Sequence, residues 1–120
     1  MPRHHHVNLG VPPGGIGAEA AFLVDVLGYR RIEPPEELRG RANWFEAEDG
    51  SQVHLSEDPD HHPAARAHTA VDFGADLRDV RDRLVRQGVE FRCFDNVGTD
   101  VVFCKDAAGN QWELRGSLPS

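Results

Sequence analysis

The sequence predicts an α+β fold made of two copies of one module, in which a strand is followed by a helix and then by three more strands. Two kinds of pattern support this class. Segments that alternate apolar and polar residues indicate half-buried strands, and two segments with apolar residues at helical spacing indicate one helix in each copy. The order of these signals is the same in residues 6–56 and 68–115, although the two stretches share almost no identities.

The first module is predicted to span about residues 4–56. Its first strand is HVNLGV, residues 6–11, and its helix is expected within residues 17–29, where Gly28 ends it because glycine tolerates the left-handed conformation that follows many helices. The apolar stripe of this helix is predicted to hold Ala18, Ala21, Phe22 and Val26. Three strand-like segments follow, and a predicted two-residue turn at residues 49–50 joins the last two.

The second module is predicted to span about residues 68–116. AHTAVDF carries its first strand, and its helix is expected within residues 75–88, where Gly88 ends it. The apolar stripe of this helix is predicted to hold Leu77, Val80, Leu84 and Val85. The turn between its last two strands is expected at AAGN, residues 107–110.

The composition is that of one globular domain over residues 1–120, with residues 57–67 as a polar linker between the modules. The net charge is −7, and the 13 basic residues are interleaved with 20 acidic ones, which argues against binding nucleic acid. No apolar run approaches the roughly 20 residues of a membrane span, so we expect no membrane partner and a cytoplasmic location. Cys93 and Cys104 lack metal-finger spacing and are expected to be reduced residues in strands.

Four of the predicted strands each place a metal-capable side chain on the face opposite their apolar residues, because side chains alternate along a strand. These residues are His6, His54, His68 and Glu113. Gly50 precedes His54 by as many residues as Gly109 precedes Glu113, so both ligand candidates are expected at the same depth in their strands. An approximate two-fold axis would bring such equivalent positions together.

Nitrogen and oxygen ligands of this kind suit Zn, Ni, Fe, Co or Mn, so the set predicts one divalent metal ion in each site. The alternative is a polar, metal-free pocket lined by solvated side chains. The other histidines are left out of the site. His4 and His5 lie toward the beginning of the chain, and His61 and His62 fall in the predicted linker, where we expect them to be exposed.

At this point the sequence resembles a known family. HVNLGVP, the helix ending in VLGY, AHTAVDF and KDAAGNQWEL are similar to the vicinal oxygen chelate superfamily, which includes glyoxalases, epimerases, extradiol dioxygenases, fosfomycin-resistance enzymes and bleomycin-binding proteins. The resemblance implies that the sheets of the two modules curve together into a half-open barrel around a metal ion. It also implies that the family's metal positions fall on His6, His54, His68 and Glu113. At the second of these, lactoylglutathione lyases usually carry a carboxylate.

The resemblance implies a metal-dependent lyase, isomerase or epimerase that acts on a small oxygen-chelating substrate through a metal-stabilised enolate or alkoxide. Glu113 and His54 are the candidate catalytic bases. Arg115 is a candidate residue of the substrate pocket. Phe45 is a second candidate residue of the substrate pocket, because a two-residue turn at residues 49–50 would place it opposite His54.

Two other functions remain open from the sequence. A non-catalytic protein that binds a small molecule or an antibiotic would retain its ligand after chelation, whereas a non-haem iron dioxygenase would use His6, His68 and Glu113. The resemblance also implies a homodimer, in which each site is formed within one chain or by modules exchanged between two chains.

Overall fold

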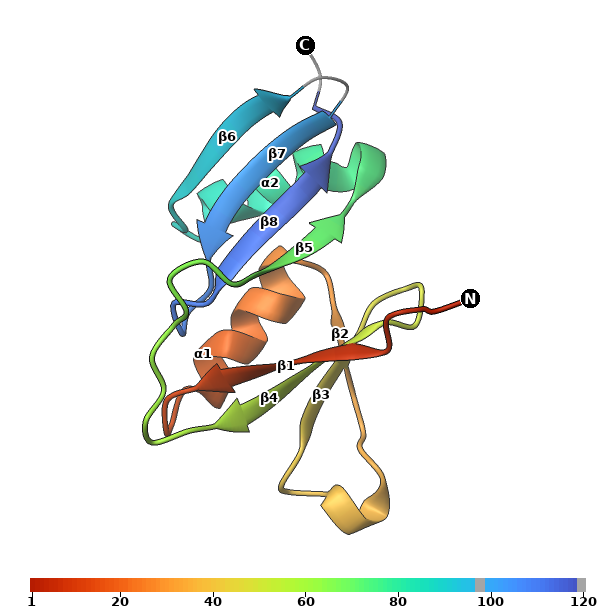
Figure 1. Cartoon of the computed structure of the whole chain (residues 1–120), viewed down its shortest axis with the longest axis vertical. Coiled ribbons are helices and arrows are strands. Elements are labelled where there is room, and N and C mark those ends of the chain that lie inside the picture. Colours follow the sequence, from red (N-terminus) through yellow and green to blue (C-terminus); the bar gives the residue numbers. More distant parts are fainter. Residues whose placement is uncertain (97–98, 119–120) are drawn as a thin grey trace. The chain divides into compact units, whose positions relative to one another are not determined.

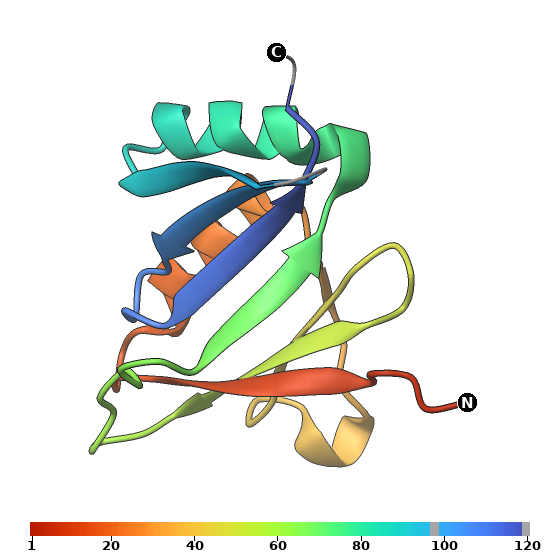
Figure 2. The ribbon, with the colours of Figure 1, turned by 45° about the horizontal axis from the view of Figure 1, so that its top comes forward.

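The computed structural model describes residues 1–96 and 99–118, and it divides into two compact units, Met1–His62 and Pro63–Ser120 (Figure 1 and Figure 2). The boundary lies within the predicted linker at residues 57–67. Each unit has the predicted order of one strand, a helix and three further strands. The α+β class and the two βαβββ modules are therefore confirmed, and their union in one domain stays a prediction.

Unit 1 contains one four-stranded sheet. Its strands are β1 (His6–Val11), β2 (Arg30–Ile32), β3 (Asn43–Glu46) and β4 (Gln52–Glu57). Its helical segments are α1 (Ile16–Ala21), the π-helical turn η1 (Phe22–Val26) and the 3-10 segment η2 (Glu36–Leu38). The strand order is β1-β4-β3-β2, in which β1 runs parallel to β4 and the other neighbours are antiparallel.

Unit 2 repeats this topology. Its strands are β5 (His68–Asp72), β6 (Phe91–Asn96), β7 (Thr99–Lys105) and β8 (Gln111–Gly116), and its helical segments are η3 (Gly74–Asp76) and α2 (Leu77–Arg86). The strand order is β5-β8-β7-β6, again with the first and last strands parallel. In the part of the chain that the structure describes, each sheet keeps two edge strands and does not close on itself. The half-open barrel, which would need both sheets, stays a prediction.

Each sheet has a buried apolar face and a polar face. The buried residues of the apolar faces are Val11, Phe45, Val53 and Leu55 in unit 1, and Val102, Cys104, Trp112 and Leu114 in unit 2. This burial follows from the alternation of side chains along a strand, whereas Val101 and His54 are buried on the opposite faces. All four predicted metal ligands lie on the opposite faces, which we call the polar faces.

The predicted apolar stripe of the first helix is partly wrong. Ala18 and Ala21 are exposed, whereas Glu19 is buried in line with Phe22 and Leu23. Hydrophobic periodicity gives no sign of a carboxylate in a buried row, because carboxylates are seldom fully buried. The helix also widens into the π-helical turn η1, which shifts the positions that face the core.

The second helix carries the predicted stripe except at its end. Leu77, Val80 and Leu84 are fully buried, but Val85 is 64% exposed. The residue after Leu84 is turned about 100° away from it around the helix axis, so it leaves the buried row. The predicted stripe is therefore wrong at Val85 alone.

Two further expectations concern the whole chain. Among the described residues, no helix combines the length and apolar character that a membrane crossing requires. Cys93 in β6 and Cys104 in β7 are free thiols, as predicted.

Candidate functional site

The first pair of predicted ligands lies on β1 and β4 of unit 1. These parallel strands pair His6 with Gln52 and Asn8 with His54, so the two histidines are diagonal neighbours on the polar face. Their imidazole rings stack, with centroids 4.0 Å apart and planes 14° apart.

The second pair lies on β5 and β8 of unit 2 in the same register. His68 pairs with Gln111, and Ala70 pairs with Glu113, as the corresponding residues do in unit 1. The His68 Nε2 atom is 3.5 Å from the Glu113 Oε1 atom. The two pairs therefore occupy equivalent positions in the two units.

The geometry of His68 and Glu113 suits a bound cation. The His68 Nδ1–H group donates to the carbonyl of Arg66 at 3.0 Å, which in a neutral ring leaves the Nε2 lone pair facing the carboxylate. Two ligand atoms bound to one ion at about 2.0–2.2 Å are separated by roughly 3.0–3.5 Å, which is close to the separation observed here. A histidine whose other nitrogen donates to a backbone carbonyl is also the usual form of a metal ligand.

Arg115 holds the other oxygen of the same carboxylate. Its Nη1 atom donates to Glu113 Oε2 at 2.9 Å, and the Glu113 side chain is only 16% exposed. The predicted pocket residue Arg115 is thus placed beside the ligand pair of unit 2, on the polar face.

The pair in unit 1 is arranged differently. The lone pair of an imidazole nitrogen lies in the plane of the ring, so two parallel stacked rings do not both aim at one ion. His54 is buried between the ring of His6 and that of Trp44, whose centroid is 4.4 Å away. His6 is exposed, and binding one ion through both histidines requires the His6 ring to turn. The Nδ1 atom of His5, which the sequence analysis left out of the site, is 2.8 Å from the His6 Nδ1 atom.

The protonation of His54 follows from its surroundings. Burial of the ring, followed by the charges of His6 and His5, lowers the pKa of His54 from 6.5 to about 4. The ring is therefore neutral at pH 7, which is the form that a metal ligand or a base requires.

The predicted pairing of Phe45 with His54 is wrong. Phe45 pairs with Val53 and is fully buried on the apolar face, and Trp44 stands opposite His54 instead. The predicted two-residue turn is a longer loop, in which the Ala47 N–H group donates to the Ser51 carbonyl. A shift of one residue in register moves every side chain to the other face. The aromatic residue beside His54 on the polar face is therefore Trp44 and not Phe45.

Trp44 has a counterpart in unit 2. Phe103 on β7 pairs with Glu113 as Trp44 pairs with His54, so each unit sets an aromatic ring beside its last-strand ligand. Phe103 also lines a cavity of about 790 Å³ in unit 2, together with Arg92, Lys105 and Gln111. Neither ring is evident from the sequence, because the position of each depends on the register across the turn.

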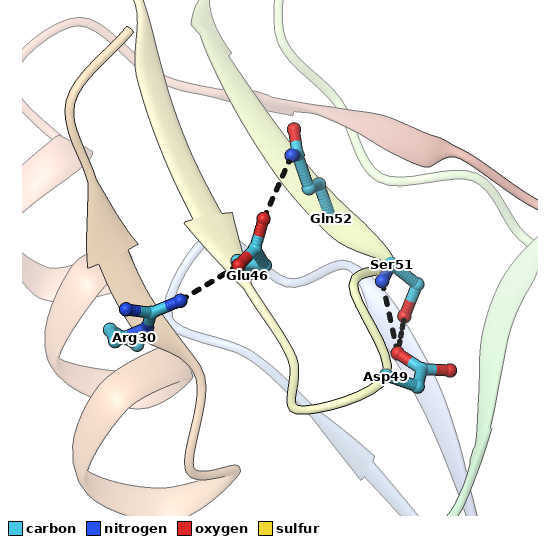
Figure 3. A network of polar contacts seen from close by, with 5 residues as sticks. All are labelled: Arg30, Glu46, Asp49, Ser51 and Gln52. Carbon is cyan, nitrogen blue, oxygen red and sulfur yellow. Dashed lines mark hydrogen bonds and ion pairs between the residues drawn. The ribbon is translucent and has the colours of Figure 1, made fainter.

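A chain of polar contacts runs from Arg30 at the edge of the sheet through Glu46 to Gln52 (Figure 3), and it continues from Gln52 to His54. Arg30 on β2 donates to Glu46 on β3 at 2.8 Å, and the Gln52 amide nitrogen on β4 donates to the other Glu46 oxygen at 3.2 Å. The His54 Nε2 atom lies 2.8 Å from the Gln52 amide oxygen. His54 must therefore release Gln52 or use its Nδ1 atom in order to bind a metal ion.

The two linker histidines differ in exposure. His62 is exposed as predicted, whereas His61 is half-buried, and a Cβ atom added at Gly10 would approach its Nδ1 atom to 3.0 Å. Among the described residues, neither unit gathers three His, Cys, Asp or Glu side chains around one point.

Comparison with known proteins adds the fold family. No family model matches the chain, and no curated protein matches it in sequence. Solved structures do match. A protein assigned to the glyoxalase family from Bacillus anthracis is 25% identical with a TM-score of 0.85, and the match covers 98% of this chain and 97% of that one. A glyoxalase/dioxygenase from Nostoc punctiforme is 21% identical with a TM-score of 0.81, covering 98% and 92% of the two chains.

The fosfomycin resistance protein FosX from Listeria monocytogenes is also similar. It is 16% identical with a TM-score of 0.78, and the match covers 98% of this chain and 95% of that chain. A mutant of the same Listeria protein, solved with Mn(II) and a dihydroxypropylphosphonic acid, matches with a TM-score of 0.75 and 17% identity over 98% and 94% of the two chains. The resemblance found in the sequence is thereby confirmed, and the chain has the glyoxalase-like fold of the vicinal oxygen chelate superfamily.

Proposed function

We propose that the protein is a divalent-metal-dependent lyase, isomerase or epimerase that acts on a small substrate through two neighbouring oxygen atoms. The observation that carries this proposal is the pair formed by His68 and Glu113. Their facing acceptor atoms and the bond from His68 to the Arg66 carbonyl suit a bound cation better than an empty polar surface.

The ligands of the metal ion are proposed to be His6, His54, His68 and Glu113. Structural and catalytic sites of first-row metals use three or four protein ligands, so one pair is too few and both pairs are needed. Zn, Ni, Fe, Co and Mn all suit this donor set, and the similar Listeria protein was solved with Mn(II). When bound, the ion supplies Lewis-acid stabilisation of negative charge on a substrate oxygen.

The other roles fall to residues around the ligands. A base beside the reacting carbon is required for a proton shift, and Glu113 and His54 are the proposed bases. His54 is neutral at pH 7, and Arg115 holds one oxygen of Glu113 on the polar face. The cavity in unit 2 is lined by Phe103 together with Arg92, Lys105 and Glu90, which supports a small substrate that carries both an apolar part and polar groups.

Metal analysis tests the proposal directly. The purified protein without an affinity tag should bind one divalent ion per site, and His68→Ala and Glu113→Gln should lose it. His62→Ala and Glu36→Gln are matched controls, because both native residues are exposed and lie outside the site. Retention of the metal by both site variants would contradict the proposal, as would absence of stoichiometric metal from the wild-type protein.

A non-haem iron dioxygenase is a second candidate. It is supported by the Gln52 contact to His54, which leaves His6, His68 and Glu113 as a set of two histidines and one carboxylate. Selective binding of iron together with substrate-dependent oxygen uptake would favour this function over redox-silent chemistry. Ligand affinity that survives chelation would instead indicate a non-catalytic binding protein of the bleomycin-resistance kind.

We also propose a cytoplasmic homodimer. The free thiols Cys93 and Cys104 support a reducing compartment. Module exchange within the dimer is tested by mixing a His6→Ala chain with a Glu113→Ala chain. Mixed dimers restore one complete site if each site takes one module from each chain, and restore none if each site belongs to one chain.

A further inference from the structure

We propose that Gln52 is a positioning residue that holds His54 in the tautomer protonated on Nε2, so that Nδ1 is the atom with which His54 binds a metal ion or accepts a proton. The use of Nδ1 rests on the proposed function. The tautomer is a property of the protein without metal, and it can be tested independently.

The orientation of the Gln52 amide is set from the edge of the sheet. Arg30 donates to Glu46 Oε1 at 2.8 Å, and the Gln52 amide nitrogen lies 3.2 Å from Glu46 Oε2 (Figure 3). A carboxylate that pairs with an arginine only accepts hydrogen bonds. The amide must therefore turn its NH₂ group toward Glu46 and its oxygen away from it.

The amide oxygen then determines the state of His54. It lies 2.8 Å from the His54 Nε2 atom, and an amide oxygen can only accept a hydrogen bond. Nε2 must therefore carry the proton. A neutral imidazole carries a single N–H group, so Nδ1 is left with the lone pair.

The ring is also held in place by its neighbours. His54 is 9% exposed, and it stacks on Trp44 with the two planes 8° apart. A 180° flip about the Cβ–Cγ bond would place Cε1 where Nε2 now meets the Gln52 oxygen, and it would break that hydrogen bond. The stack on Trp44 therefore fixes the plane of the ring, and the Gln52 bond fixes which way round the ring lies.

Unit 2 uses the equivalent glutamine for another purpose. The Gln111 amide nitrogen donates to the carbonyls of Ala64 and Ala65, at 3.1 and 2.7 Å. The histidine of unit 2 has its tautomer set instead by the Arg66 carbonyl, which receives the proton of His68 Nδ1. The nitrogen that keeps its lone pair is therefore Nδ1 in His54 and Nε2 in His68.

The experiment measures the imidazole nitrogens by long-range ¹H–¹⁵N NMR in metal-free protein at pH 7. His54 should show one tautomer, with the proton on Nε2. In Glu46→Gln, Arg30 can still only donate, so the new amide should turn its oxygen to Arg30 and its NH₂ group to Gln52. The Gln52 amide should then reverse, and His54 should shift toward the tautomer protonated on Nδ1. Gln52→Met, which removes the acceptor at similar volume, should give a mixture of tautomers.

Two controls keep the test specific. Asp49→Asn changes the neighbouring turn, where Asp49 accepts bonds from Ser51 (Figure 3). It touches none of the hydrogen bonds that link Arg30, Glu46, Gln52 and His54. Gln87→Met makes the same chemical change as Gln52→Met on an exposed residue. Both should keep the wild-type tautomer.

The outcomes separate this inference from the proposed function. A wild-type His54 protonated on Nδ1, or a tautomer unchanged in both Glu46→Gln and Gln52→Met, would overturn it. On addition of Zn²⁺, the Nε2 proton should persist while the Nδ1 shift changes, and loss of that proton would also overturn it. A lack of response to Zn²⁺ at every histidine would contradict the metal site alone, because the tautomer is decided in the metal-free protein.

Discussion

The two units place their ligand pairs on equivalent strands in the same register, yet they prepare the side chains differently. In unit 2, His68 and Glu113 face each other at 3.5 Å, and His68 is oriented by a backbone carbonyl. In unit 1, His6 and His54 stack as parallel rings, and His54 is bonded to Gln52. The repeated backbone therefore determines where a ligand stands, whereas the neighbouring side chains determine which atom it presents.

The turns before the last strands differ in the same way. Both turns place a glycine at positive φ, Gly50 at 89° and Gly109 at 86°. In unit 2 the turn is tied to the core, because the buried Asp106 accepts bonds from two backbone N–H groups and from the Trp112 indole. In unit 1, Asp49 bonds only to the neighbouring Ser51 in the described contacts.

The largest contrast should appear in metal affinity. We expect His68→Ala to weaken Zn²⁺ binding by more than about 100-fold, because it removes a pre-oriented ligand, a change larger than the usual effect of losing an outer residue. His54→Gln should weaken it by roughly 10-fold, since the stacked rings of His6 and His54 do not both aim at one ion until His6 turns. Competition with a chelator of known affinity measures both losses. Equal losses would remove the distinction between the two pairs.

The next effect concerns the register in unit 1. Phe45→Ala should lower the free energy of unfolding by about 3–5 kcal/mol, because it removes a fully buried ring. Trp44→Ala, on the polar face, should cost roughly 1 kcal/mol and should broaden the His54 resonances through loss of the stack. Urea denaturation measures both. A larger cost for Trp44→Ala would indicate that the sequence-predicted register is the correct one.

The turns provide a smaller contrast in stability. Asp106→Ala should lower the free energy of unfolding by about 2–3 kcal/mol, because the buried Trp112 N–H group loses its acceptor. Asp49→Ala should change it by no more than about 0.5 kcal/mol, because Asp49 is exposed. Asp106→Asn, which keeps an acceptor oxygen, should recover part of the loss. Thermal or urea unfolding of the three variants decides whether the turn of unit 2 is the better anchored one.

The last effect is a pH dependence that arises from His54 in unit 1. The pKa of His54 is about 4 in the folded protein and close to 6.5 in the unfolded chain. Between pH 4 and pH 6.5, the unfolded chain therefore binds a proton at His54 that the folded protein does not bind. The contribution of His54 to stability is therefore complete above pH 6.5 and is lost as the pH falls toward 4. Metal-free His54→Gln should lose less stability than wild type between pH 7 and pH 4.5. Parallel unfolding curves for the two proteins across this range would contradict the shift.

Much of the fold and of the site followed from local patterns. Alternation along the strands identified the polar-face positions of His6, His54, His68 and Glu113, because the side-chain period of a strand does not depend on what the strand pairs with. The repeated order of strand, helix and glycine identified the two modules in the same way. These are properties of short segments, so one sequence is enough to find them.

Tertiary structure decided the features that depend on pairing. Trp44, not Phe45, faces His54 because the loop before β4 is longer than two residues, and its length sets the register. Glu19 lies in the buried row of the first helix, where hydrophobic periodicity does not reveal it. The tautomer of His54 depends on Arg30 and Glu46, which are distant in sequence and meet it only across three paired strands. The sequence by itself therefore determined which side chains are available for chemistry, and the packing of the strands decided which atoms they present.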